Sequence, residues 1–421
     1  MRDRAEAERL DAQDALASLR SAFHIPKRHD GGDCIYLCGH SLGLAPKRAV
    51  DLVNEELRAW QTQGVEGHFA GPRPWVSYHE QVAQGLALLA GAQADEVVAM
   101  NSLTVNLHLL FVSFYRPQGA RHRILIERTA FSSDRYAVQS QLQFHGYDPK
   151  TALLEIAPRA GEDHIRTEDI LATIDQARDQ LALVWLPGVQ YLNGQVFDMQ
   201  TITRAAHACG ATVGWDLAHA IGNVPLHLHD WDVDFAVWCG YKYLNGGPGA
   251  IGGAFVHSRH ARSFDRPRFA GWWAHDPATR FEMPSDFSPT TGAPGWQLSN
   301  PPILAITPLI AALDVFTRAG IDRLNSKSVQ LTSYLHELLQ AYCADRVDVI
   351  TPSSARGAQL SLRVRGPRDH ARTVFDRLGA AGVLCDWREP DIIRVAPVPL
   401  YNRFTDVWDF VHVLRAICRE Q

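Results

Sequence analysis

The chain has 421 residues, of which 46% are hydrophobic and 21% are charged, and its formal net charge is −5. These values are typical of a globular protein of two or three domains, and they argue against a basic nucleic-acid-binding protein. No apolar run on the order of 18 residues indicates a membrane span. We therefore expect a small-molecule substrate, with no nucleic acid and no membrane as partner.

The compartment is predicted from the cysteines and the N-terminus. The seven cysteines are odd in number and scattered, which is typical of free thiols in a reducing compartment. The first residues are charged and lack the apolar core of a secretory signal. Both observations favour the cytoplasm.

The predicted elements begin with a helix over residues 1–20. A longer helix follows from Ala45 to about Gln63. Ser77-x-x-Glu80 resembles a capping box that opens a third helix, and Gly91 marks the expected end of that helix.

From residue 97 onward, short apolar runs alternate with helical stretches. This alternation favours an α/β fold, in which a mostly parallel sheet is flanked by helices. We expect this large domain to span residues 45–300. Its predicted strands are Val97–Met100, Ile124–Glu127, Leu181–Leu186, Ala211–Asp216 and Asp234–Cys239, with helices over Thr104–Tyr115 and Asp198–Cys209.

A different pattern begins after Pro301-Pro302, with helical stretches over 303–319 and 322–343. We expect a smaller C-terminal α+β domain over 301–421, with residues 1–44 as an N-terminal segment that packs against it. Its extended runs are Val347–Thr351, Gln359–Val364 and Ile392–Val395.

An acid and an amine follow two neighbouring predicted strands. Asp216 ends one strand, and Lys242 lies just past the next, between two tyrosines. The C-terminal ends of parallel strands border one crevice, so both side chains can reach one ligand. An enzyme that uses pyridoxal 5′-phosphate (PLP) needs such a pair, because the amine forms a Schiff base and the carboxylate holds the ring nitrogen protonated. The alternative is a capping Asp216 and a surface Lys242.

Other PLP contacts have weaker signals. The turn Asn101–Thr104 joins a predicted strand to a helix, whose N–H groups can bind a phosphate, although most such turns bind nothing. Phe131-Ser132-Ser133-Asp134 offers a ring and a carboxylate, or else a core Phe and a helix cap. His227-x-His229-Asp230 lacks further ligands at a fitting spacing, so we expect no metal.

Seven motifs resemble those of kynureninases, fold-type I PLP hydrolases of tryptophan breakdown, over about residues 35–405. They are Cys38-Gly39-His40-Ser41-Leu42-Gly43-Leu44, Gly71-Pro72-Arg73-Pro74-Trp75, Phe131-Ser132-Ser133-Asp134, Asp216-Leu217-Ala218-His219-Ala220, Tyr241-Lys242-Tyr243-Leu244-Asn245, Ser299-Asn300-Pro301-Pro302 and Ile393-Arg394-Val395-Ala396-Pro397-Val398-Pro399-Leu400-Tyr401-Asn402.

The resemblance implies a role for each matching residue. Lys242 would hold PLP and shuttle a proton, Asp216 would pair with the ring nitrogen, and Tyr241 would bind the phosphate and donate a proton. The other implied cofactor-binding residues are Leu103, Thr104, Phe131, Ser132, Ser133, Asp134, His219, Trp272 and Asn300. The implied substrate-binding residues are Ser41, His68, Asn300 and Arg394, of which Arg394 would hold the substrate α-carboxylate.

The implied reaction is hydrolysis of the Cβ–Cγ bond of L-kynurenine or 3-hydroxy-L-kynurenine, in tryptophan catabolism and NAD biosynthesis. Polar His68 and Asn300 favour the 3-hydroxy substrate. Trp272 and Asn300 match positions that reach the site from a second subunit, so a homodimer with a shared active site is implied. At the position where some relatives have a serine that contacts the cofactor, this chain has Pro187.

Two alternatives stay open. The chain could be another fold-type I enzyme, such as an aminotransferase or a desulfurase, and Cys385 is then the cysteine to test as a nucleophile. It could also be a binding protein on an inactive PLP scaffold, although intact Lys242, Asp216 and Arg394 argue against that.

Overall fold

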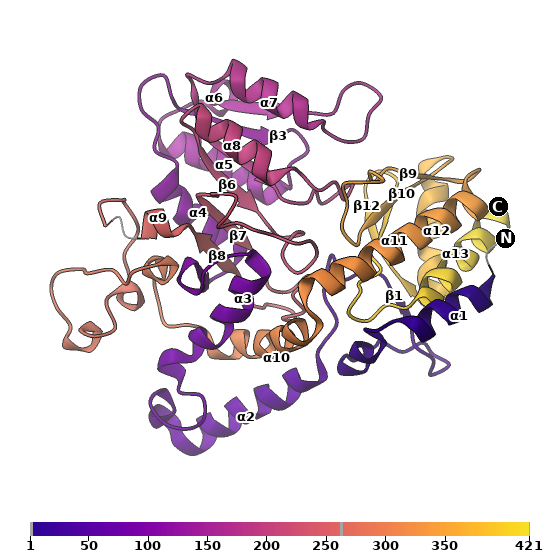
Figure 1. Ribbon diagram of the computed structural model, residues 1–421, viewed down its shortest axis with the longest axis horizontal. Coiled ribbons are helices and arrows are strands. Elements are labelled where there is room, and N and C mark those ends of the chain that lie inside the picture. The colour runs from indigo at the N-terminus through magenta and orange to yellow at the C-terminus, as the bar shows by residue number, and fades with distance from the viewer. Residues whose placement is uncertain (1–2, 262–263, 421) are drawn as a thin grey trace.

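The computed structural model describes residues 3–261 and 264–420. Two lobes lie side by side along the long axis of the molecule (Figure 1). One lobe is built on a seven-stranded sheet and the other on a four-stranded sheet. Within the described ranges, no single helix is long and apolar enough to cross a membrane, and the one helix pair that passes by length and composition is bent by 82°.

The seven strands of the large lobe follow the order β2-β8-β7-β6-β5-β3-β4. Five neighbours, from β7 to β4, run parallel, and β8 runs antiparallel to both of its neighbours. The predicted α/β class with a mostly parallel sheet is confirmed. The strands are β2 (Val97–Ala99), β3 (Arg123–Glu127), β4 (Leu153–Ile156), β5 (Leu181–Pro187), β6 (Thr212–Asp216), β7 (Phe235–Trp238) and β8 (Gly253–Val256).

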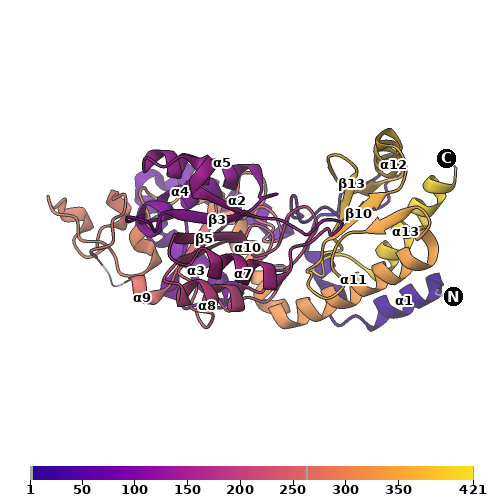
Figure 2. The same ribbon diagram turned by 90° about the horizontal axis from the view of Figure 1, so that it is seen from above.

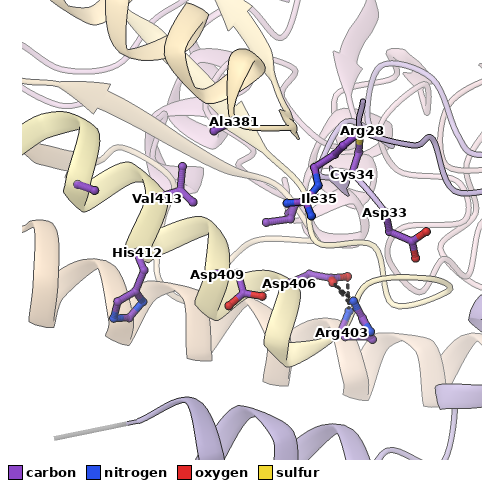
Figure 3. Close-up of a pocket in the computed structure, with 11 residues that line it drawn as sticks. Arg28, Asp33, Cys34, Ile35, Ala381, Arg403, Asp406, Asp409, His412 and Val413 are labelled. Atoms are coloured by element: carbon purple, nitrogen blue, oxygen red, sulfur yellow. Dashed lines mark hydrogen bonds and ion pairs between the residues drawn. The ribbon is translucent and has the colours of Figure 1, made fainter. Parts of the chain in front are cut away.

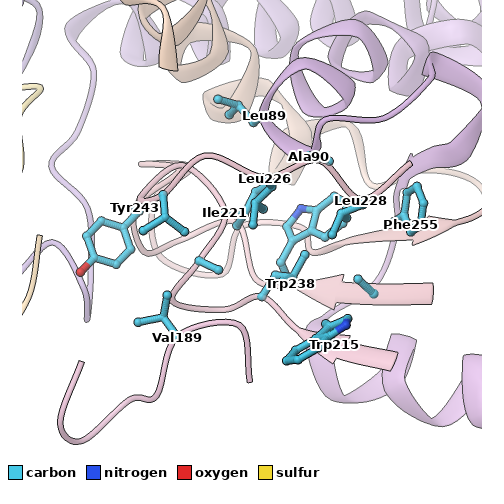
Figure 4. Packing of buried hydrophobic residues seen from close by; sticks show 14 of the residues in the cluster. Leu89, Ala90, Val189, Trp215, Ile221, Leu226, Leu228, Trp238, Tyr243 and Phe255 are labelled. Atoms are coloured by element: carbon cyan, nitrogen blue, oxygen red, sulfur yellow. The ribbon is translucent and has the colours of Figure 1, made fainter. Parts of the chain in front are cut away.

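Helices cover both faces of this sheet (Figures 1 and 2). Successive strand residues point to opposite faces, and both faces are apolar because both are covered. Trp215 and Trp238 pack into the core of one face (Figure 4), and Trp185 stacks on Phe235 at 5.7 Å on the other. The helices are α2 (Lys47–Gln63), α3 (Ala83–Ala90), α4 (Leu103–Phe114), α5 (Ser132–Phe144), α6 (Pro149–Ala152), α7 (Thr167–Gln176), α8 (Met199–Ala208), α9 (Ser258–Ala261) and α10 (Ile303–Ala319).

Two predicted helices differ from the structure. The first ends at Gln13, because the Asp14 carboxylate accepts a hydrogen bond from Leu16 N and starts a new turn. The capping box at Ser77 was wrong. Ser77 lies inside a 3₁₀ helix, where its hydroxyl donates to Pro74 O, and α3 begins six residues later at Ala83. Gly91 ends α3 in the left-handed conformation, as predicted.

The small lobe contains an antiparallel sheet in the order β12-β13-β10-β9. Helix α1 (Arg4–Gln13) lies along α13, where Asp11 accepts a hydrogen bond from Phe404 N at 2.6 Å (Figure 2). Strand β1 (Ile35–Tyr36) pairs in parallel with β11. The other elements are β9 (Val347–Val349), β10 (Leu360–Val364), β11 (Val383–Leu384), β12 (Asp386–Arg388), β13 (Ile392–Val395), α11 (Ile321–Cys343), α12 (Arg368–Ala380) and α13 (Phe404–Arg419).

Helix α10 packs against the large lobe. Its Ala311 lies in one apolar cluster with Ala49 and Leu52 of α2. The domain boundary expected at residue 301 would assign α10 to the small domain, although α10 packs against α2 of the large lobe. We propose that the boundary between the domains lies after α10, near Gly320.

Candidate active site

The site lies where the parallel strands of the large lobe end. β6 ends at Asp216, and the loop after β7 carries Lys242. Helices α4 and α5 begin just after β2 and β3 at the same edge. Arg394, on β13 of the small lobe, donates to the Tyr191 carbonyl just past β5, so it faces this edge too. Ligands of open α/β sheets bind at this edge.

Lys242 is half-buried, and it is not a surface lysine. Its Nζ lies 3.0 Å from Nε2 of His219 and 5.9 Å from the ring centres of Phe131 and Tyr241. The N-terminal segment supports this loop, since Gly43 N donates to Tyr241 O at 2.8 Å. A Cβ at Gly43 would lie 2.3 Å from the Lys242 carbonyl oxygen, so a larger residue cannot fit there.

Two buried carboxyl groups lie beneath the lysine. Asp216 accepts a hydrogen bond from Ala218 N at 2.7 Å. Burial and the nearby charge of Asp216 raise the pKa of Asp134 well above its ordinary value. Burial also raises the pKa of Asp216, although the Lys242 ammonium opposes this shift. Asp134 Oδ1 has no hydrogen-bond partner in the described chain, so the pair can still accept a positively charged ring nitrogen.

Helices α4 and α5 begin side by side and form an anion cradle. Thr104 Oγ1 and Ser133 Oγ, one from each first turn, lie 2.6 Å apart. Neither N-cap residue, Ser102 or Phe131, caps its helix with a side-chain hydrogen bond. The free N–H groups of both helices can therefore bind a phosphate. A lysine, paired carboxyls and an anion cradle at one edge of the sheet fit PLP.

Arg394 is held by two neighbours at the junction of the lobes. It is the cross-strand partner of Asp386, and its Nη2 donates to Asp386 Oδ2 at 2.6 Å. Its Nη1 donates to the Tyr191 carbonyl at 2.5 Å. The Arg394 side chain is only 1% exposed, and its Nε has no hydrogen-bond partner in the described residues. Arg394 can therefore still bind a carboxylate.

Some of the other predicted site residues lie near Lys242, and others lie apart from it. Leu103 and Ser132 lie in the first turns of α4 and α5. Ser41 lies two residues before Gly43, in the N-terminal segment that contacts the Lys242 loop, and the His68 ring packs edge-on against Trp75 at 5.3 Å. In the described chain, Trp272 packs on Trp273 and Phe281 and not on Lys242, and Asn300 is exposed.

Sequence reasoning missed several residues of the site: Glu127, Tyr191 and Asp386. Glu127 ends β3, so its place at a strand end was a signal that could have found it. Asp386 and Tyr191 reach Arg394 only through the tertiary structure.

Glu127 is a third buried carboxyl group. Its Oε1 accepts a hydrogen bond from Gln190 Nε2 at 3.2 Å, and Oε2 has no partner among the described residues. Burial raises the pKa of Glu127 from its ordinary 4.5 to about 7. Because the charged form is disfavoured in the folded state, ionisation of this group opposes folding.

We expect Glu127→Gln to remove a pH-dependent loss of stability. A folded-state pKa above the unfolded value means that the wild type loses stability as the pH rises from 4.5 to about 7. The loss is of the order of 3 kcal/mol, at about 1.4 kcal/mol per pKa unit. In thermal unfolding, the advantage of the variant over the wild type should grow from about pH 5 to about pH 8. An advantage that does not change with pH would contradict this.

His229, which resembles a metal ligand in the sequence, lies in a different cluster. Its Nδ1 contacts Glu96 Oε1 at 2.9 Å, and its ring stacks on His257 at 4.9 Å. The Glu96 carboxylate also accepts hydrogen bonds from Gln93 N and Ser258 N. The first bond caps the turn before β2 and the second ties this turn to the start of α9, so the Glu96 carboxylate has a structural role.

A surface hollow of about 700 Å³ lies in the small lobe, away from the strand ends (Figure 3). Its charged groups already have ion-pair partners, as Arg403 and Asp406 do at 2.8 Å. The group of residues around Lys242 is therefore the better candidate for a ligand site.

Known proteins resemble this chain closely. A family model described as the kynureninase C-terminal domain matches residues 324–414. A kynureninase from Koribacter versatilis (strain Ellin345) is 55% identical over 404 residues, which cover 96% of this chain and 95% of that protein. A kynureninase from Myxococcus xanthus (strain DK1622) is 55% identical over 416 residues, which cover 98% and 97%.

Solved structures resemble the fold at low identity. A cysteine desulfurase from Escherichia coli has a TM-score of 0.77 at 18% identity, over 96% of this chain and 98% of that one. An alanine–glyoxylate aminotransferase from Nostoc sp. has a TM-score of 0.68 at 15% identity, over 94% and 96%.

Burial raises the pKa of Cys385, which keeps that thiol protonated and argues against a desulfurase nucleophile.

The fold and the group of residues around Lys242 define a PLP-dependent enzyme of fold type I, and PLP is its cofactor. The similar sequences then identify the family within this class. The chain belongs to the kynureninase family, and it is a hydrolase that acts on carbon–carbon bonds.

Proposed function

We propose that this chain hydrolyses the Cβ–Cγ bond of L-kynurenine or 3-hydroxy-L-kynurenine and releases L-alanine with anthranilate or 3-hydroxyanthranilate. The identity of 55% with kynureninases over nearly the full length carries this proposal. The reaction would serve tryptophan catabolism and pyridine nucleotide biosynthesis in the cytoplasm. The test is release of L-alanine from either substrate by the PLP-loaded protein. No release from either would overturn the proposal.

PLP, when bound, supplies a ring that takes up the negative charge that develops at the substrate Cα. Lys242 would hold the cofactor and then move the proton at Cα, with His219 fixing its Nζ. Asp216 would keep the ring nitrogen protonated, and Asp134, with its raised pKa, would stay neutral. The other proposed cofactor contacts are Leu103, Thr104, Ser132 and Ser133 at the phosphate and Phe131 on the ring face.

We propose Tyr241 as the group that donates a proton to the substrate Cβ. Burial raises the pKa of Tyr241, so its hydroxyl stays protonated. Tyr241→Phe should lower kcat on L-kynurenine by roughly 10²–10⁴-fold, while the visible absorbance of the cofactor persists. Tyr115→Phe is the control, because Tyr115 is buried just past the C-terminal end of α4 and its hydroxyl donates to His122 O. Full activity of Tyr241→Phe would remove Tyr241 from this role.

We propose that 3-hydroxy-L-kynurenine is the preferred substrate. His68 and Asn300 offer polar groups that can hydrogen-bond the ring hydroxyl, and a site built around such a bond rejects analogues that lack it. The measurement is kcat/KM on both substrates, and a clear preference for plain L-kynurenine would refute the proposal.

We propose a homodimer in which Trp272 and Asn300 reach the site of the other chain. An exposed aromatic surface supports this proposal. Phe69 and Phe281 are 63% and 53% exposed with rings 5.9 Å apart, and the Trp272 ring lies 5.5 Å from Phe281. Apolar surface of this kind marks protein interfaces.

Phe281→Ser should shift this dimer toward monomers, because it removes apolar area from the centre of the aromatic surface. Sedimentation velocity at micromolar concentration is the measurement, and activity should fall together with the dimer fraction. Phe144→Ser, at an exposed position at the end of α5, is the matched control. A Phe281→Ser protein that stays fully dimeric would contradict the proposal.

A further inference from the structure

His40 is a buried histidine to which the proposed reaction gives no task. Its side chain is 0% exposed, and neither ring nitrogen has a hydrogen-bond partner within the described residues. A buried polar group without a partner costs free energy, and nearly all such groups are satisfied in native proteins. An unsatisfied ring beside an active site therefore points to a ligand atom as its partner.

His40 lies between the two groups that would fix the substrate. Its Nε2 is 3.8 Å from Asp386 Oδ2, the oxygen that accepts from Arg394 at 2.6 Å. On its other side, the His40 ring is 6.4 Å from the ring of His219, whose Nε2 contacts Lys242 Nζ at 3.0 Å. A polar group that binds between Lys242 and Arg394 would thus meet His40.

The charges around His40 favour a neutral ring. Burial and the positive charges of Arg394, Lys242 and Arg388 lower the pKa of His40 well below its ordinary value. A neutral imidazole offers one N–H donor and one acceptor nitrogen. It can donate to an anion here without adding a charge beside the paired Arg394 and Asp386.

We propose that His40 donates a hydrogen bond to the α-carboxylate of the amino-acid substrate and is therefore a further substrate-binding residue. Asp386 and the Tyr191 carbonyl each accept one Nη hydrogen of Arg394, and among the described residues its Nε has no hydrogen-bond partner. The carboxylate then receives hydrogen bonds from Arg394 on one side and from His40 on the other. This inference rests on the proposed function and on the expected role of Arg394 in holding the substrate α-carboxylate.

The test uses the PLP-loaded protein and L-alanine, which has the α-amino and α-carboxylate groups without the aryl ketone. Binding is followed by the change in the visible absorbance of the cofactor and not by turnover. His40→Leu should weaken the Kd of L-alanine roughly 10- to 100-fold, as expected for a lost hydrogen bond to a charged group. His40→Asn, which keeps an N–H donor, should recover much of this loss.

Two controls separate a lost contact from a damaged site. Anthranilate has no α-carboxylate on an amino-acid carbon, so its Kd should not change in His40→Leu. His336→Leu is the matched variant, because His336 Nδ1 is also buried without a partner in the described chain but lies on α11, outside the site. It should bind L-alanine as the wild type does.

An unchanged Kd of L-alanine in His40→Leu would overturn the inference, and so would equal weakening of L-alanine and anthranilate. If His40→Leu does not fold, His40→Phe keeps the ring volume without a donor and gives the same comparison with His40→Asn. A wild type that binds L-alanine but releases none from kynurenine would count against the proposed function alone.

Discussion

Lys242→Ala is expected to abolish the visible absorbance band of the bound cofactor and to lower hydrolysis of L-kynurenine by at least roughly 10²–10⁴-fold. The reason is that one amine would both hold PLP and move the proton at the substrate Cα. The measurement is the absorbance spectrum after addition of PLP, followed by kcat on L-kynurenine.

Lys150→Ala is the matched control for this variant, since Lys150 is exposed on α6, away from the strand ends. It should keep both the absorbance band and the activity. Thermal unfolding of the two variants checks that each is folded. A Lys242→Ala protein that retained the band would remove Lys242 as the residue that holds the cofactor.

Arg394→Leu is expected to damage both substrate binding and stability. We propose that Arg394 binds the substrate α-carboxylate, so the loss of this charge-assisted hydrogen bond should raise KM roughly 10- to 100-fold. The substitution also leaves Asp386, whose side chain is only 10% exposed, without its closest cation. Breaking a buried ion pair in this way typically costs about 3–5 kcal/mol. Arg388, 3.1 Å from the same carboxylate, should keep the cost at the lower end.

The double variant Arg394→Leu/Asp386→Leu separates these two effects. Without the buried carboxylate, the free energy of unfolding should return toward that of the wild type, while KM should stay high. Urea unfolding and steady-state kinetics on all three proteins are the measurements. A double variant that recovers both stability and KM would mean that Arg394 has only a structural role.

Much of the fold was predictable, because its signals are local. The alternation of apolar strands with helices predicted the parallel sheet, and β6 ends at Asp216 as expected. Residues that follow neighbouring parallel strands lie at the same edge of the sheet. The sequence therefore predicted that Asp216 and Lys242 lie at one site.

The errors arose where local signals competed. Ser77 and Glu80 have the spacing of a capping box, but the chain that precedes them contains Pro72 and Pro74 and enters a 3₁₀ helix at Trp75. The Ser77 hydroxyl then bonds the Pro74 carbonyl and cannot cap a helix.

The contacts around Arg394 could not be predicted, because they join segments far apart in the chain. Asp386 is its partner across two antiparallel strands, and Tyr191 comes from the other lobe. The sequence likewise could not show that both ring nitrogens of His40 lack a hydrogen-bond partner in the described chain, because this requires the positions of all neighbouring donors and acceptors.

The segment between α1 and α2 touches both lobes, through the pairing of β1 with β11 and through the bond from Gly43 to the Tyr241 carbonyl. The residues ahead of the large sheet are therefore not a dispensable leader. Removing the residues up to Gly43 would delete both contacts, and the loop that carries Lys242 would lose a backbone hydrogen bond.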